Sequence, residues 1–171
     1  YMDTNMKSTF VPNRNAIFSS VMYAYAISIY KRTLKNTSIC LGVHSGDHLI
    51  YPDCRPEFYN SIIKSFHLGN WDSEYIDTYL PYINFSKSEI IKDGMNSCKH
   101  LDLDFNLIFS NTLTTYSPDK DGRSDGMTGS DVERILSFNE IGLKDPGLYN
   151  KKWSELIEYA LNCEKEVSSK N

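Results

Sequence analysis

The sequence predicts a layered α/β domain with a parallel sheet, and three observations support this prediction. Apolar residues recur at three- and four-residue spacing between residues 17 and 29, which is the pattern of a helix. The apolar run ICLGV at residues 39–43 follows a turn-like segment and is typical of a buried strand. Capping patterns further along the chain predict more helices, and such alternation is typical of layered α/β folds.

The first predicted helix follows Asn13 and Asn15, both of which can cap a helix. It ends near Lys31 and Arg32, because cations are favourable at a helix C-terminus. We interpret its apolar stripe as a face that packs on the core. The stripe consists of Ile17, Phe18, Val21, Met22, Tyr25 and Ile29.

Residues 44–55 are rich in glycine, proline and polar groups, and they predict a loop directly after the strand. A second helix is expected from Pro56, which is tolerated in a first turn. Its inner face would hold Phe58, Ile62, Ile63 and Phe66. Residues 75–85 favour a second strand.

The second half of the chain contains two capping boxes, which start at Ser86 and at Ser130. The first predicts a helix that ends at Gly94, and the second predicts a helix through about Ile141. A long loop is expected over residues 111–129. A last helix over residues 151–163 would precede a frayed polar tail at 165–171, and residues 1–171 would form a single domain.

Composition excludes several classes of function. The net charge of −4 and the pI of about 5.5 argue against a broad basic nucleic-acid face, although a small nucleotide needs only a few cations. No apolar run reaches the length of a membrane span. The four cysteines contain no C-x-x-C pair, so we expect reduced thiols and a cytoplasmic protein.

The loop after the predicted strand concentrates groups that can do chemistry. Asp47, His48, Asp53, Cys54 and Arg55 lie within nine residues, where α/β folds place their ligand sites. Arginine can bind a carboxylate or phosphate through two parallel bonds, and histidine can move protons. The alternative is an ordinary polar loop with an internal Asp–Arg pair. Cys54 itself fits a small buried thiol better than a nucleophile, because no third orienting group is identifiable.

Two more cations stand at predicted helix starts. Arg14, with the exposed N–H groups of a helix N-terminus, could form an anion site. Lys87 lies in a first turn, where the helix dipole disfavours a cation unless an anion is near. The alternative for both is a solvated surface side chain.

These segments resemble, in order, the motifs of the 7-cyano-7-deazaguanine synthase family. VPNRN at residues 11–15 is similar to the family's V-P-x-R-N-x-x-F, and YPDCRPEF at 51–58 is similar to its Y-P-D-C-R-x-x-F. FSKSEII at 85–91 resembles L-x-K-x-E-I-I. SDVER at 130–134, with Phe138, Gly142, Asp145 and Pro146, resembles the helix that follows the family's zinc motif.

The resemblance implies a Rossmann-like adenine nucleotide α-hydrolase (PP-loop) fold, of which this chain is the C-terminal part. It implies that ATP with Mg adenylates the carboxylate of 7-carboxy-7-deazaguanine, which ammonia and a second activation convert to the nitrile. The implied nucleotide-binding residues are Arg14, Asn15 and Lys87. The implied substrate-binding residues are Asp47, His48, Tyr51, Asp53, Cys54 and Arg55, and the implied catalytic residues are Asp53, Arg55 and Lys87.

The chain departs from the family at the zinc site. Thr115, Asp125, Thr128 and Asp131 occupy the positions of the four cysteines. Two carboxylates and two hydroxyls make a poor zinc site, so we expect no structural zinc and a loop held by other means. The residues leave open whether Asp125 and Asp131 bind another metal.

The family's S-G-G-x-D-S pyrophosphate loop is also absent from these residues. It could lie upstream or on another chain, or the protein could use no ATP. Three functions therefore stay open: a synthase of 7-cyano-7-deazaguanine, an antiviral-defence relative that attaches a deazaguanine to a protein partner, and a non-catalytic deazaguanine-binding module. A homodimer is a further possible assembly.

Overall fold

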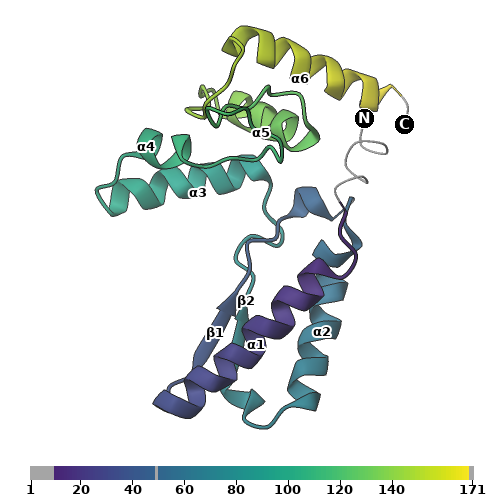
Figure 1. The fold of residues 1–171 in the computed structure, drawn as a ribbon, viewed down its shortest axis with the longest axis vertical. Coiled ribbons are helices and arrows are strands. Elements are labelled where there is room, and N and C mark those ends of the chain that lie inside the picture. The colour runs from purple at the N-terminus through teal and green to yellow at the C-terminus, as the bar shows by residue number, and fades with distance from the viewer. Residues whose placement is uncertain (1–9, 49, 170–171) are drawn as a thin grey trace. The chain divides into compact units, whose positions relative to one another are not determined.

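The computed structural model describes residues 10–48 and 50–169. The chain forms two compact units, a first unit of residues 10–86 and a second unit from Lys87 onward (Figure 1). A single domain over residues 1–171 therefore stays a prediction. In the described part of the chain, no helix is long and apolar enough to cross a bilayer.

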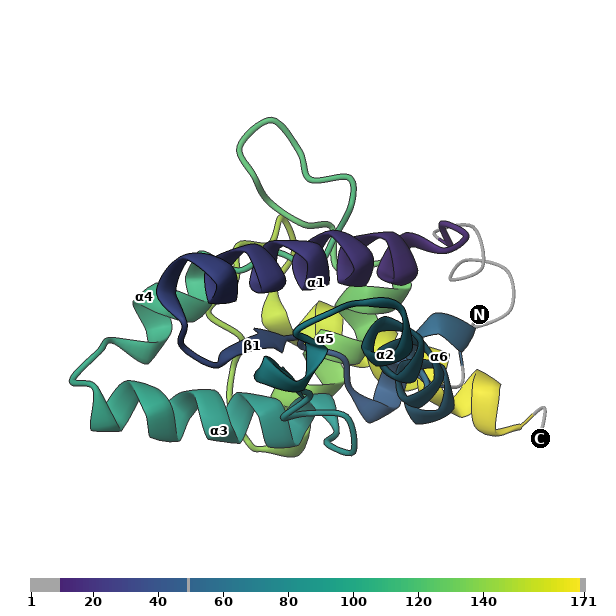
Figure 2. The same cartoon turned by 90° about the horizontal axis from the view of Figure 1, so that it is seen from below.

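The first unit is a small α/β structure with a parallel sheet, as the sequence predicts. Strands β1 (Thr37–Cys40) and β2 (Ile76–Tyr79) pair in parallel, with Thr37 opposite Ile76. Helix α1 (Arg14–Thr33) lies along the strand pair, and α2 (Pro56–Gly69) is the crossover between the two strands (Figures 1 and 2). The predicted start of α2 at Pro56 is confirmed.

The core of this unit has two neighbouring parts. One joins α1 to the sheet through Tyr23, Ala26, Ile39 and Ile76. The other contains Val43, Cys54 and Tyr59, and it lies where the chain leaves β1 and enters α2. The loop between β1 and α2 forms two 3-10 turns, Ser45–Asp47 and Pro52–Cys54. A third 3-10 turn, Ser73–Tyr75, precedes β2.

The predicted core face of α1 is wrong for four of its six residues, whereas Met22 packs against the core and Ile29 is partly buried. Ile17, Phe18, Val21 and Tyr25 are exposed, whereas Ser19, Tyr23 and Ala26 are buried. The helix is apolar nearly all round, so periodicity alone could not select the side that meets the sheet. The second strand is also shorter than predicted, since β2 ends at Tyr79, two residues before a proline that cannot donate to a strand ladder.

The second unit is helical, with α3 (Lys87–His100), α4 (Phe105–Ser110), α5 (Gly129–Glu140) and α6 (Trp153–Ser168). Its core lies between α5 and α6. The buried residues there are Val132, Ile135, Leu156, Ala160 and Cys163. Residues 111–128, between α4 and α5, form the expected long loop (Figure 2).

Three helix boundaries in the second unit differ from the prediction. Helix α3 continues through Gly94, where a Cβ atom would come within 2.9 Å of the Phe109 ring, so this glycine allows α3 to approach α4. Helix α5 is capped by Thr128, not Ser130, because the Thr128 hydroxyl accepts the Asp131 N–H at 3.3 Å. Helix α6 extends past Cys163 into the segment predicted to be frayed.

The long loop is fixed to α6 at Gly126. This residue has a φ of +72°, and an added Cβ would lie 2.2 Å from Cδ2 of Leu156. Gly122 has a similar φ of +76°, but nothing lies within 4 Å of its added Cβ.

We expect Gly126→Ala to lower the free energy of unfolding by about 3 kcal/mol, through left-handed strain plus overpacking. Gly122→Ala is the matched control and should cost only the backbone strain, about 1 kcal/mol. Urea unfolding of both variants measures the difference. Equal losses would show that the loop does not pack on Leu156 as described.

Candidate functional site

The start of α1 is joined to the loop that follows β1 by a set of hydrogen bonds. The backbone N–H of Asn15 donates to Asp53 Oδ2 at 3.3 Å. The Asn15 side-chain amide donates to the Asp53 carbonyl at 3.2 Å and to Cys54 Sγ at 3.3 Å. Asn13, the N-cap residue, makes no side-chain cap bond. Asp53 therefore does the capping from 38 residues away, and it brings together two of the motifs found in the sequence.

The Asp53 carboxylate is buried and only half satisfied. Asp53 is 7% exposed, and within the described residues its Oδ1 has no hydrogen-bond partner. The Tyr59 hydroxyl and His48 Nε2 are likewise buried without a partner there. A buried polar atom without a partner costs about 1–3 kcal/mol. Six such atoms occur among the described residues, and two of them, His48 Nε2 and Asp53 Oδ1, belong to the loop after β1, where an external group could pair with them.

Cys54 is a buried residue of this loop, and its thiol is protonated at neutral pH. Burial, with the negative charges of Asp47 and Asp53, raises its pKa to about 11. Burial also raises the pKa of Tyr59 to about 12. The thiolate is the reactive form of cysteine, so the geometry favours Cys54 as a buried packing group that also accepts from Asn15.

The other loop residues surround the same turn. Arg55 is exposed, and its Nε donates to the His48 carbonyl at 2.8 Å. Tyr51 stacks its ring on Phe10, with centroids 6.5 Å apart. The Arg55 side chain thus has its remaining N–H groups at the surface of the loop, where a carboxylate could accept two of them.

His44 is a loop residue that the sequence analysis did not single out. It is buried, its Nδ1 accepts the Gly46 N–H at 3.2 Å, and its Nε2 lies 3.3 Å from Asp47 Oδ2. Because Nδ1 is an acceptor, the ring proton is on Nε2, which donates to Asp47. His44 therefore orients Asp47, and only the adjacency of His44 to the polar loop could have suggested this role.

Lys87 belongs to the second unit, at the first position of α3. Its ammonium forms an ion pair with Glu133 of α5, and both side chains are partly buried. The anion that the helix-start position suggested is thus present within the protein. Arg14 and Asn15 lie in the first unit, where Arg14 Nε donates to Asn15 Oδ1 at 3.3 Å.

The four residues at the family's zinc positions make hydrogen bonds within the protein, and two of them, Thr128 and Asp131, bond to each other. Asp131 is almost fully buried, and its two oxygens accept from the hydroxyls of Thr114 at 2.9 Å and Thr128 at 2.5 Å. Thr115 accepts from a backbone N–H of its own turn, and Asp125 is exposed and accepts the N–H of Met127. No group of three or more metal-binding side chains occurs among the residues that the structure describes.

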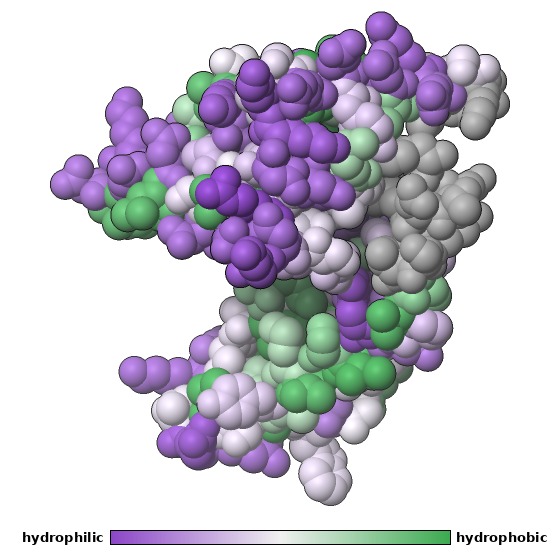
Figure 3. All heavy atoms as spheres, turned by 45° about the horizontal axis from the view of Figure 1, so that its top comes forward, coloured by the Kyte–Doolittle hydropathy of each residue, from purple (hydrophilic) through white to green (hydrophobic). Residues whose placement is uncertain are grey.

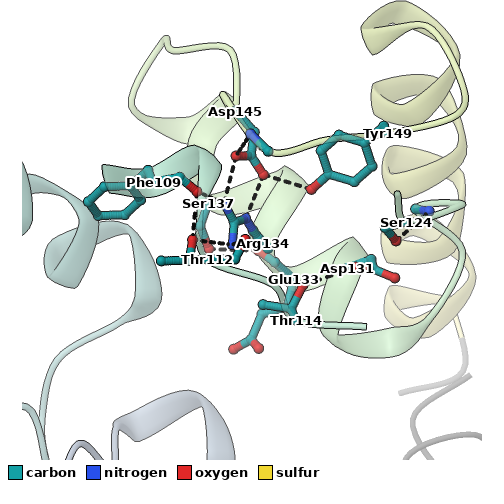
Figure 4. A network of polar contacts seen from close by, with 12 residues as sticks. Phe109, Thr112, Thr114, Ser124, Asp131, Glu133, Arg134, Ser137, Asp145 and Tyr149 are labelled. Carbon is teal, nitrogen blue, oxygen red and sulfur yellow. Dashed lines mark hydrogen bonds and ion pairs between the residues drawn. The ribbon is translucent and has the colours of Figure 1, made fainter. Parts of the chain in front are cut away.

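A buried ion pair holds the rest of this loop region (Figure 4). Arg134 of α5 binds Asp145 through two bonds, from Nε at 2.6 Å and from Nη2 at 2.8 Å. Its guanidinium also donates to the Phe109 carbonyl and to the carbonyl and hydroxyl of Thr112. Tyr149 donates to Asp145 at 2.7 Å, and burial beside that carboxylate raises the pKa of Tyr149. Arg134 thus binds α5 both to the segment before it, at Phe109 and Thr112, and to the segment after it, at Asp145.

The first unit is a parallel α/β unit with a polar loop after β1, the place where open α/β sheets bind their ligands. The family model described as "Queuosine biosynthesis protein QueC" matches residues 1–142, and the chain belongs to this family. It is 42% identical over 146 residues to the 7-cyano-7-deazaguanine synthase of Marinomonas sp. (strain MWYL1). The aligned region is 85% of this chain and 59% of that protein.

Other relatives agree with this assignment. The chain is 38% identical over 150 residues to 7-cyano-7-deazaguanine synthase 2 of Colwellia psychrerythraea, covering 88% of this chain and 61% of that protein. It is 40% identical over 147 residues to the synthase of Caldicellulosiruptor saccharolyticus, covering 85% and 57%. The chain therefore spans about three fifths of the length of these curated relatives. No solved structure matches it.

We expect Asp145→Asn to lower the free energy of unfolding by about 3 kcal/mol, because it leaves the Arg134 charge buried without its counter-charge. Asp72→Asn is the matched control, since Asp72 lies 3.7 Å from Lys31 in an exposed pair and should cost less than about 0.5 kcal/mol. Urea unfolding compares the two. A loss for Asp145→Asn as small as that of the control would contradict the structural role of the pair.

Proposed function

We propose that this chain provides the deazaguanine-binding part of an ATP-dependent 7-cyano-7-deazaguanine synthase with a Rossmann-like PP-loop fold. The observation that carries the proposal is the buried Asp53 carboxylate, whose Oδ2 caps α1 while Oδ1 has no partner within the described residues. The heterocycle of 7-carboxy-7-deazaguanine carries ring and exocyclic N–H donors that such an oxygen can accept.

The neighbouring residues fit the other end of this substrate. Arg55 has an exposed guanidinium that can bind the substrate carboxylate through two parallel bonds. Asp47 and His48 flank the same turn, and Asp47 is oriented by His44. Protonated Cys54 and the ring of Tyr51 would provide apolar contact beside the heterocycle. Asp53 and Arg55 therefore bind and orient the substrate in this proposal.

The residues proposed for the nucleotide are Arg14 and Asn15 in the first unit and, separately, Lys87 in the second unit. Bound ATP with Mg would supply the adenylation of the substrate carboxylate. Arg14 supplies a cation at the first position of α1 for a phosphate, although the Asp53 carboxylate already accepts the Asn15 N–H of that helix start. Lys87 fits such a role only in part, since Glu133 already neutralises its charge.

Binding of 7-carboxy-7-deazaguanine, measured by isothermal titration calorimetry, tests the proposal. We expect Asp53→Asn to weaken binding at least about tenfold, the effect of one charge-assisted hydrogen bond. Arg55→Met should do the same, and because Arg55 is exposed this variant tests the site even if Asp53→Asn unfolds α1. Asp77→Asn, on the exposed side of β2, is the control. Wild-type failure to bind, or unchanged affinity in Arg55→Met, would refute the assignment.

Two other outcomes would change the function without changing the site. A mass increase on a co-expressed protein would indicate that a deazaguanine is attached to a protein partner, as in an antiviral-defence relative. Ligand binding without ATP consumption by the complete protein would indicate a binding module. A cytoplasmic location and a homodimer stay predictions.

We also propose that this chain needs no structural zinc. Both oxygens of Asp131 are already occupied by threonine hydroxyls, and Asp125 is directed into its own exposed turn. We expect elemental analysis to find no stoichiometric zinc, and EDTA to leave the melting temperature unchanged. Stoichiometric zinc, or a loss of stability in EDTA, would refute this.

A further inference from the structure

The 3-10 turn Ser45–Asp47 is fastened to the segment that follows β2. Both the backbone N–H and the hydroxyl of Ser45 donate to the Phe85 carbonyl, at 3.0 and 2.8 Å. These two bonds join the chain segments that leave the carboxyl ends of the parallel strands β1 and β2. Open α/β sheets bind their ligands at that end. The backbone of the turn is therefore held by Ser45, apart from any bond that its last residue makes.

His44 contacts this turn through both of its ring nitrogens. Nδ1 accepts the backbone N–H of Gly46 at 3.2 Å, and Nε2 lies 3.3 Å from Asp47 Oδ2. The ring is buried, and His44 is 8% exposed. A neutral imidazole carries one proton, and only the tautomer with that proton on Nε2 can make both contacts. The ring thus caps the turn and also holds the carboxylate of the last residue in the turn.

The Asp47 carboxylate acts on the same buried group as Asp53. Burial, followed by the negative charges of Asp47 and Asp53, raises the pKa of the Cys54 thiol to about 11. Both carboxylates therefore lie near one thiol, which places Asp47 beside the Asp53 site. Hydrophobic residues, by contrast, gather on the visible surface of the first unit, in the lower half of Figure 3, and such side chains offer no directional bond to a polar ligand.

We propose that His44 is a positioning residue for ligand binding, because its Nε2–H holds the Asp47 carboxylate in the orientation that meets the N–H donors of a heterocyclic ligand. His44 acts through Asp47 and does not touch the ligand. A side chain that is fixed before binding loses less conformational freedom when the ligand arrives, so this orientation increases affinity. The inference rests on the proposed function, in which Asp47 belongs to the deazaguanine site.

Positioning can be separated from simple capping, because asparagine can replace one contact of His44 but not the other. Asparagine is a preferred N-cap residue, so its side-chain oxygen in His44→Asn can accept the Gly46 N–H. Its amide ends at the place of Nδ1 and does not extend to that of Nε2, so the bond to Asp47 is lost. If His44 were only a cap, His44→Asn would bind like the wild type.

Isothermal titration calorimetry with 7-carboxy-7-deazaguanine compares the wild type, His44→Asn, Asp47→Asn and the double variant. We expect His44→Asn to weaken binding about tenfold, the effect of one hydrogen bond. The double variant should bind no more weakly than Asp47→Asn alone, because His44 acts through Asp47. His100→Asn is the matched control, since His100 is an exposed histidine of the second unit, and it should bind like the wild type.

A second measurement uses the wild-type chain without ligand. Long-range ¹H–¹⁵N correlation spectra above neutral pH should show His44 with its proton on Nε2 and with Nδ1 unprotonated. The signals are assigned by their loss in His44→Asn. A proton on Nδ1 would overturn the proposal, since that tautomer can neither accept from Gly46 nor donate from Nε2 to Asp47. This spectrum decides the matter if circular dichroism shows that His44→Asn does not fold.

The calorimetry also separates this proposal from the proposed function. If the wild type binds and His44→Asn binds equally well, the positioning role is wrong while the deazaguanine site stands. Losses that multiply in the double variant would likewise show that His44 does not act through Asp47. Failure of the wild type to bind would overturn the proposed function and the role of His44 together.

Discussion

The bonds between Asn15 and Asp53 organise the whole first unit. A helix leaves its first N–H groups without partners, and here the side chain that accepts one of them comes from the loop beyond β1. The same contact holds the Pro52–Cys54 turn against α1, and this turn buries Cys54 above Tyr59. The polar loop is therefore held in place by α1, and this capping uses Oδ2 of Asp53 while Oδ1 has no partner among the described residues.

The second unit depends on a different charge. Arg134 takes its counter-ion from Asp145 and fills its remaining N–H groups with oxygens from residues 109 and 112. Buried arginine is costly unless every donor is matched, so the surrounding loops have little freedom. Asp131 likewise holds the long loop to α5, because its carboxylate accepts hydrogen bonds from the hydroxyls of Thr114 and Thr128. Directional hydrogen bonds thus fix the region in which the family resemblance implies a metal.

The sequence predicted features that have local causes. Three features follow from the backbone preferences of single residues. They are the start of α2 at a proline, the polar loop after a buried strand, and the end of α5 before Gly142. The motif resemblance, confirmed by the family match, brought Arg14, Asn15 and Asp53 into one hypothesis before any contact was known.

Features with non-local causes could not be predicted. The buried side of α1 depends on where the sheet lies, and the uninterrupted course of α3 at Gly94 depends on Phe109. Lys87 and Glu133 are 46 residues apart, so no spacing rule links them. The role of His44 depends on its bonds to Gly46 and Asp47, and only its position in the polar loop could have suggested it.

We propose that Asp53 Oδ1, which has no partner among the described residues, accepts a hydrogen bond from a deazaguanine. The most direct measurement is a map of backbone amide chemical shifts while 7-carboxy-7-deazaguanine is added to the ¹⁵N-labelled protein. We expect the largest shifts for the amides of Asn15, Asp53, Cys54 and Arg55, and no shift for those of Arg134 and Asp145. No shifts in the loop after β1, or shifts confined to the second unit, would contradict it.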